Sequence, residues 1–339
     1  MDRRSGGRIL PAEGSHGVIL AGDVGGTKVL LRLGDGGGVL AEERYPSRDF
    51  GSLTEIVRAF LDAAGRGRPD RAAFGIAGPI DDNRCRATNL PWDVDGNRMG
   101  HDLGIARVRL LNDFEAVGRG LEVLDPDDIA VLNPPEPDPR GRIAILGAGT
   151  GLGEGFMVPC GGHEYAFVPS EGGHTDFAPR NDKEMGFLRF MLRVHRRVSI
   201  ERAVSGPGIA NLFHYLVDAG GKPAESVSRE IAGGADIAAV VAGHAADRSC
   251  LVCVEAMDMF WNLYGAEAGN LALKVLPAGG IFLAGGIVAK NLAALRSGPF
   301  MAAYGFKGRM SDLVREFPVR AILNQKVGLL GAALVAERL

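Results

Sequence analysis

The chain of 339 residues has few cysteines, no long apolar run and almost no excess charge, and each shortage excludes a class of protein. Four cysteines show neither the number nor the spacing of a disulfide framework or a four-ligand zinc site. No apolar run approaches the roughly 18 residues that a membrane span requires. A net charge of −3 supplies no basic surface for nucleic acid or an anionic membrane. We therefore expect a cytoplasmic protein with no nucleic-acid or membrane partner.

Glycine, in contrast, is abundant, and it gathers in short clusters. The 50 glycines are about twice the usual share, while 46% hydrophobic and 23% charged residues are typical of a globular chain. The length is sufficient for two lobes with large cores. Residues 1–15, rich in glycine, serine and charge, are expected to form a disordered tail.

Apolar runs separated by glycine turns predict the same supersecondary unit twice. In the first half, strands are expected at 18–21 and 28–33, a third strand at 39–45, and a helix at 52–64. In the second half, the apolar runs 143–146 and 156–158 flank another glycine-rich turn. The segment ILAGDVGGTKVLL (19–31) therefore resembles AILGAGTGLGEGFMV (144–158) as a weak internal repeat. Two related α/β lobes facing a cleft are the expected consequence.

Three glycine turns at strand ends are candidate phosphate sites, because glycine amides can approach an anion closely. The chain contains no P-loop pattern and no G-x-G-x-x-G that opens a helix. Asp23 beside the first turn could hold Mg²⁺ directly or through water, although a plain hairpin turn is the alternative. The candidate nucleotide-binding residues are Gly22, Asp23, Val24, Gly25, Gly26 and Thr27 in the first turn, Gly149 and Thr150 in the second, and Gly285 and Gly286 in the third.

Six ordered motifs carry a resemblance that covers the chain from about residue 18 to its end. They are GDVGGT (22–27), LNDFEAVG (111–118), GAGTGLG (147–153), PSEGGHTDFAP (169–179), ERAVSGPG (201–208) and GGIFLAGGIV (279–288). The sequence resembles the bacterial glucokinases, an ATP-dependent hexokinase-like family of the actin/Hsp70/sugar-kinase superfamily. The resemblance implies an α/β, two-lobed actin-like (ribonuclease H-like) ATPase fold, with mixed sheets flanked by helices and the active site in the inter-lobe cleft. It implies a small lobe of residues 16–123 plus 325–339 and a large lobe of residues 124–324.

The resemblance also assigns roles to polar residues. A kinase that phosphorylates an alcohol needs a carboxylate to accept the hydroxyl proton, and Asp113 is the candidate general base. From its position alone, Asp113 could equally cap the helix expected from residue 114. The residues expected to bind the sugar are Asn89, Asn112, Asp113, Glu171, His174 and Glu201.

The expected reaction is transfer of the γ-phosphoryl group of MgATP to the 6-hydroxyl of glucose, giving glucose 6-phosphate and ADP. A homodimer is implied by the family. One alternative is a kinase for another hexose or an amino sugar. A second alternative is a non-catalytic sugar-sensing regulator, which the retained Asp113 and the absence of a helix-turn-helix pattern in residues 1–17 disfavour.

Overall fold

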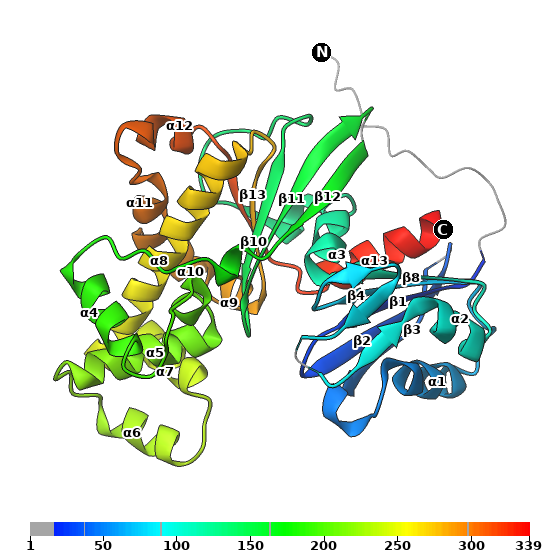
Figure 1. Cartoon of the computed structure of the whole chain (residues 1–339), viewed down its shortest axis with the longest axis horizontal. Helices are drawn as coiled ribbons and strands as arrows, with labels where there is room; N and C mark the ends of the chain where they lie inside the picture. The colour runs from blue at the N-terminus through cyan, green and yellow to red at the C-terminus, as the bar shows by residue number, and fades with distance from the viewer. Residues whose placement is uncertain (1–16, 37, 89, 163, 297) are drawn as a thin grey trace. The chain divides into compact units, whose positions relative to one another are not determined.

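The computed structural model describes residues 17–339, apart from residues 37, 89, 163 and 297 (Figure 1). The chain divides into two compact units. The first unit contains the chain up to Leu111 together with Ala332–Leu339, and the second contains Asn112–Gly331.

The first unit holds a five-stranded mixed sheet in the order β3-β2-β1-β4-β8 and a small antiparallel sheet in the order β5-β6-β7. Its elements are β1 (Ile19–Val24), β2 (Lys28–Asp35), β3 (Gly38–Pro46), the 3₁₀ turn η1 (Ser47–Asp49), α1 (Leu53–Ala64), β4 (Arg71–Ile76), β5 (Ile80–Asp81), β6 (Arg84–Arg86), β7 (Asp93–Asp95), α2 (Gly96–Leu103) and β8 (Arg107–Asn112).

The second unit is built on a six-stranded mixed sheet in the order β12-β11-β10-β13-β14-β9. Its strands are β9 (Ile129–Val131), β10 (Ile143–Ala148), β11 (Leu152–Gly161), β12 (Glu164–Ser170), β13 (Gly280–Ala284) and β14 (Val319–Ile322). Its longer helices are α3 (Asp113–Gly120), α4 (Asp182–Met191), α5 (Gly206–Asp218), α6 (Glu225–Ala232), α7 (Ile237–Ala246), α8 (Leu251–Val275) and α13 (Val327–Arg338), which ends in the first unit.

Short helical segments complete the second unit. They are η2 (Pro126–Asp128), η3 (Gly172–His174), η4 (Ile200–Arg202), α9 (Gly286–Lys290), α10 (Leu292–Arg296), α11 (Pro299–Gly305), η5 (Gly308–Met310) and α12 (Ser311–Arg315).

The predicted internal repeat is confirmed by the strand pairing. Strand β1 pairs with β2 in antiparallel fashion and with β4 in parallel fashion. Strand β10 makes the same two kinds of pair, with β11 and with β13. Each hairpin closes on a glycine turn, between Val24 and Val29 in the first unit and between Ala148 and Leu152 in the second.

Helix α1 covers one face of the five-stranded sheet. Its predicted N-cap is confirmed, since the Ser52 hydroxyl accepts a hydrogen bond from the Glu55 amide at 3.3 Å. Apolar residues of α1, α2 and the strands form one core, which includes Leu20 and Val24 of β1. Because strand side chains alternate, Asp23 lies on the other face of β1.

Alternation along β10 also separates two cores in the second unit. Ala144 and Leu146 join the large core around α5, α7 and α8, whereas Ile145 joins a smaller core with Met157 and Val327. Helix α3 packs on the second of these faces, beside β11 (Figure 1). Helices α8 and α3 therefore pack on opposite faces of the sheet.

The lobe boundaries expected from the resemblance differ from those of the two units. The units divide at residues 111/112 and 331/332, rather than at 123/124 and 324/325. Close backbone contacts account for the difference, because a Cβ at Gly331 of α13 would lie 1.8 Å from the Ala116 carbonyl oxygen of α3. Helix α3 and the beginning of α13 consequently pack together within the second unit.

Among the described residues, no single helix is both long enough and apolar enough to cross a membrane. Helices α7 and α8, with a bend of 102° between them, meet these criteria of length and composition only as a pair.

Candidate active site

The first glycine turn joins β1 to β2 in the first unit. The Gly25 amide donates to the Lys28 carbonyl at 3.0 Å, and the Ser47 hydroxyl donates to the Gly25 carbonyl at 2.9 Å. Ser47, which is distant in the sequence, therefore stabilises the turn. Gly22 also has a packing role, because a Cβ at this position would lie 2.4 Å from the Phe74 ring.

Asp23 is a half-buried carboxyl at the end of β1, beside this turn. Burial raises its pKa, and the Lys28 ammonium group lowers it. The carboxylate is thus incompletely compensated by positive charge, and a hard oxygen ligand in this position suits Mg²⁺. The residues present therefore fit a Mg²⁺ ion bound together with nucleotide phosphates.

The second glycine turn joins β10 to β11 in the second unit. The Gly149 amide donates to the Gly151 carbonyl, and the Gly206 amide donates to the Gly149 carbonyl, both at 2.8 Å. No atom lies within 4 Å of the position that a Cβ of Gly149 would take. Helix α5 begins beside the turn, where the Ser205 hydroxyl accepts from the Gly208 amide at 3.0 Å. A helix N-terminus and exposed glycine backbone together favour a phosphate.

The third glycine turn begins where β13 ends, and it touches the end of β10. Gly285 has φ = 98°, and a Cβ there would lie 2.7 Å from the Ala148 carbonyl oxygen. Only glycine satisfies both conditions. The second and third turns, with the exposed Thr150 and the adjacent Gly286, therefore lie next to each other in the second unit.

Glu171, His174 and Glu201, which the resemblance names as sugar ligands, lie close together. The His174 ring lies between the two carboxylates, with Nε2 3.9 Å from Glu171 Oε2 and Nδ1 3.9 Å from Glu201 Oε1. The Glu171 and His174 side chains are exposed, and Glu201 is partly buried. Two acceptor groups and an imidazole at this spacing can bind several hydroxyls of one sugar.

Glu201 links this group to the second glycine turn. Its Oε2 accepts a hydrogen bond from the Leu152 amide at 2.9 Å. A Cβ at Gly151 would lie 2.4 Å from the same oxygen, so the carboxylate lies close against the turn. A candidate sugar ligand is thus in contact with the backbone of a candidate phosphate turn.

Asn112 and Asp113 lie where β8 ends and α3 begins. Asn112 is the N-cap, and its Oδ1 accepts from the Phe114 and Glu115 amides at 2.9 and 3.4 Å. Asp113 is the first residue of the helix, and its Oδ1 also accepts from the Phe114 amide, at 3.0 Å. The N-cap role that was the alternative for Asp113 therefore belongs to Asn112.

Phe114 fixes this helix start on the sheet. An ideal Cβ at Gly153 would lie 2.0 Å from the Phe114 ring, and one at Gly147 would lie 2.9 Å from it. Two glycines of the GAGTGLGEG stretch therefore make room for an aromatic ring. Glycine richness in this hairpin has a packing cause as well as the predicted phosphate cause.

The second unit contains most of the predicted residues, and the first unit contains one turn. The second unit contains Asn112, Asp113, Gly149, Thr150, Glu171, His174, Glu201, Gly285 and Gly286, and the first contains Gly22 through Thr27. Asn89 lies outside the described residues. Ser47 and Phe114 could not be predicted, since contacts with residues far away in the sequence have no local signal. Ser205 was detectable, because a Ser before Gly-Pro-Gly is typical of a helix start.

Fold and site together define a class: an α/β phosphotransferase whose glycine turns suit phosphates and whose acceptor loop suits a sugar. A family model for glucokinase matches residues 20–339. The glucokinase of a Nostoc species is 43% identical over 344 residues, covering 95% of this chain and 99% of that protein. The chain belongs to the glucokinase family, and it is an ATP-dependent, glucose-phosphorylating enzyme.

Solved structures agree with this assignment. A glucokinase from an Antarctic psychrotroph matches with a TM-score of 0.79 and 30% identity, covering 95% of this chain and 99% of that one. A ROK family glucokinase from Streptomyces griseus, in complex with glucose and AMPPNP, matches with a TM-score of 0.67 and 20% identity, covering 95% and 100%. The predicted two-lobed actin-like fold class is confirmed.

Proposed function

We propose that the chain transfers the γ-phosphoryl group of MgATP to the 6-hydroxyl of glucose, with Asp113 as the general base. One observation carries the proposal: the Glu201 carboxylate contacts both the His174 ring and the backbone of the second glycine turn. Candidate sugar and phosphate ligands are therefore neighbours within one unit, which a phosphoryl transfer requires.

Asp113 would accept the proton of the 6-hydroxyl as the sugar oxygen attacks the γ-phosphorus. General bases of this kind orient the hydroxyl and remove the charge that develops on it. Two features would hold its carboxylate in place: the hydrogen bond from the Phe114 amide and the seat of the Phe114 ring on the sheet. Asn112 would contribute to sugar binding from the adjacent position.

Glu171, His174 and Glu201 would bind the other sugar hydroxyls. Each hydroxyl can donate to a carboxylate and accept from a donor, so the alternating carboxylate–imidazole–carboxylate arrangement suits a polyol. Asn89 is proposed as a further sugar ligand from the resemblance alone.

The glycine turns would bind the nucleotide. In the first unit, Gly25, Gly26 and Thr27 would approach phosphate oxygens and Asp23 would hold Mg²⁺, directly or through water. In the second unit, Gly149, Thr150, Gly285 and Gly286 would contact ATP. The Mg²⁺ ion, when bound, neutralises charge on the phosphate oxygens. The Streptomyces griseus relative was solved with glucose and AMPPNP, which supports this ligand pair for the fold. A cytoplasmic location and a homodimer belong to the same proposal.

A substrate panel tests the proposal. Initial rates with ATP and glucose, mannose, fructose, N-acetylglucosamine or glucosamine should give the highest kcat/KM for glucose. Sites that hydrogen-bond a hydroxyl discriminate strongly against analogues that lack or misplace it. Coupling to a dehydrogenase specific for glucose 6-phosphate identifies the phosphorylated position. A higher kcat/KM for another sugar would favour the alternative of a different hexose or amino-sugar kinase.

A further inference from the structure

Glu154 has no role in the proposed chemistry, and it lies against the Gly172–His174 turn. Glu154 is in β11, opposite Ser170 of β12. Its neighbours in the strand pattern, Leu152 and Phe156, belong to the large apolar core, and Glu154 is only 3% exposed. A carboxyl therefore occupies a position where strand alternation demands an apolar side chain.

The Glu154 carboxyl touches the turn that carries the sugar ligands. A Cβ at Gly172 would lie 1.8 Å from Glu154 Oε2. Gly172 directly follows Glu171, and the turn it begins ends at His174. The carboxyl group thus lies directly against the Gly172 backbone.

The surroundings of Glu154 favour its neutral form. Glu154 Oε1 is buried without a hydrogen-bond partner, and so is Oε1 of Glu267 on α8. The pKa of Glu154 is raised to about 7: burial is the largest cause, the negative charge of Glu267 acts in the same direction, and Lys274 acts against them. Tyr264 of α8 is a third titratable neighbour: burial raises its pKa, and the negative charge of Glu154 acts in the same direction.

Glu267 is held by other groups of α8 and the following segments. Its Oε2 accepts from Asn270 at 2.9 Å, and its Oε1 lies 3.7 Å from the Lys274 ammonium. Asn270 in turn accepts from the Lys307 ammonium at 2.6 Å, and burial lowers the pKa of Lys307 to about 8. On the strand side, β10 and β12 present the uncharged Leu146 and Ser170 opposite Glu154.

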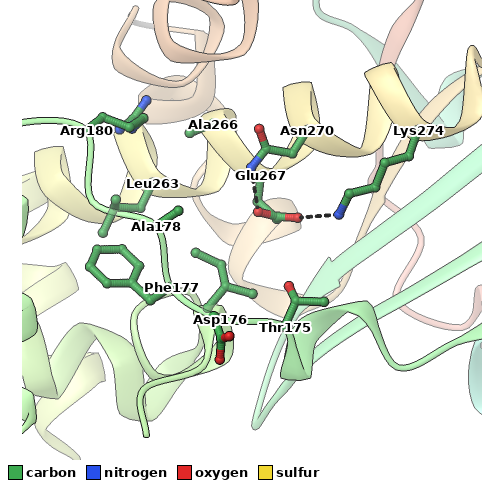
Figure 2. Close-up of a pocket in the computed structure, with 11 residues that line it drawn as sticks. Thr175, Asp176, Phe177, Ala178, Arg180, Leu263, Ala266, Glu267, Asn270 and Lys274 are labelled. Carbon is green, nitrogen blue, oxygen red and sulfur yellow. Dashed lines mark hydrogen bonds and ion pairs between the residues drawn. The ribbon is translucent and has the colours of Figure 1, made fainter.

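A cavity of about 230 Å³ borders Glu267. Its walls include Thr175 and Asp176, which follow His174 along the chain, and Glu267, Asn270 and Lys274 of α8. Figure 2 shows Lys274 and Asn270 both directed at the Glu267 carboxylate, with Thr175 on the facing loop. Water in this cavity can therefore reach the Glu267 carboxylate, the charged neighbour of Glu154.

We propose that Glu154 is a positioning residue for glucose binding: its protonated carboxyl supports the Gly172–His174 turn and so holds Glu171 and His174 toward the sugar. The inference rests on the proposed function of those two residues. When the pH rises above neutrality, Glu154 ionises beside Glu267. The like charges repel, and the carboxylate draws in water or shifts, which displaces the Gly172 backbone. Glucose then binds less tightly.

The test compares Glu154→Gln with the wild type at saturating ATP, from about pH 6 to about pH 9. Glutamine keeps the shape of the neutral acid but cannot ionise. We expect the KM for glucose of the wild type to rise about threefold or more above pH 7, whereas the variant shows no such rise. Glu164→Gln, which changes an exposed glutamate of the same hairpin, is the matched control and should keep the wild-type profile. If Glu154→Gln does not fold, Glu154→Met removes the same titration and carries the same expectation.

A pH profile for the variant that coincides with the wild-type profile would overturn the proposal. A second measurement tests the contact itself. Gly172→Ala should raise the KM for glucose sharply, and Glu154→Ala in the same chain should restore most of the loss by making room for the methyl group. Additive effects would also overturn the proposal. Failure of the proposed function would look different, because the wild type itself would then not phosphorylate glucose.

Discussion

Substituting Gly153 with alanine should damage catalysis through Phe114, although neither residue reaches a ligand in the proposed mechanism. The added Cβ would lie 2.0 Å from Phe114 Cε2 and 2.4 Å from Cζ, where ordinary contacts begin near 3.4 Å. The ring must therefore retreat by about 1 Å or more, and Asp113 is its covalent neighbour. A displacement of about 1 Å at a reacting group can cost about 100-fold in rate.

Stability should fall as well, because overpacking a well-filled site typically costs about 1–3 kcal/mol. The assays are urea unfolding and kcat at saturating glucose and MgATP. Gly243→Ala in α7 is the matched control: no atom lies within 4 Å of the added methyl, so kcat and stability should be kept or improved.

The double variant Gly153→Ala/Phe114→Leu decides whether the steric reasoning is right. The smaller leucine leaves room for the methyl group, so the second substitution should recover a large part of the kcat lost by the first. The coupling free energy should be of the order of 1–3 kcal/mol, as for residues in direct contact. Additive losses would refute the proposed contact between Phe114 and Gly153. A Gly153→Ala enzyme with the same kcat and stability as the Gly243→Ala control would refute it as well.

Three further predictions concern single groups. Asp23→Ala should raise the KM for MgATP and shift the Mg²⁺ dependence, while glucose affinity measured by calorimetry stays unchanged; a normal Mg²⁺ titration would reduce the first turn to a plain hairpin. Glu171→Gln and His174→Ala should each weaken glucose binding about 10- to 100-fold, since a hydroxyl left without its partner costs about 1–3 kcal/mol; unchanged calorimetric affinity would remove the residue from the site. Because the folded-state pKa of Glu154 is raised from 4.5 to about 7, the wild type loses stability as pH rises through that interval. At pH 8, the free energy of unfolding in urea should be higher for Glu154→Gln than for the wild type by up to about 3 kcal/mol, and at pH 4.5 this gain should be absent. Equal differences at both pH values would contradict the pKa shift.

Local signals in the sequence sufficed for the hairpins and for the start of α1. The alternation of apolar residues on either side of GDVGGT predicts two paired strands, and Ser52 before an amphipathic stretch predicts a cap. Both features depend on residues a few positions apart. The spacing of Glu171 and His174, three residues apart in one turn, is local in the same sense.

Long-range packing decided the features that could not be predicted. Nothing near Gly153 in the sequence indicates that Phe114, 39 positions earlier, will occupy the space above it. The same holds for Gly172 against Glu154 and for Ser47 against Gly25. Each pairing depends on which strands become neighbours in the sheet, which the local pattern leaves undetermined. Within one glycine cluster, therefore, some glycines are proposed to contact phosphate, and others make room for a side chain.

The central claim is that Asp113 removes the proton of the attacking hydroxyl, and Asp113→Asn tests it most directly. Asparagine keeps an Oδ1 that can accept the Phe114 amide hydrogen bond, so the start of α3 is preserved while the base is lost. The measurement is the single-turnover rate of ATP and glucose conversion by rapid quench, with glucose affinity determined in parallel by calorimetry. The account predicts nearly unchanged affinity and a rate lowered about 10²- to 10⁴-fold, equivalent to about 3–5 kcal/mol of barrier. A single-turnover rate within about threefold of the wild type would contradict the claim that Asp113 is the base.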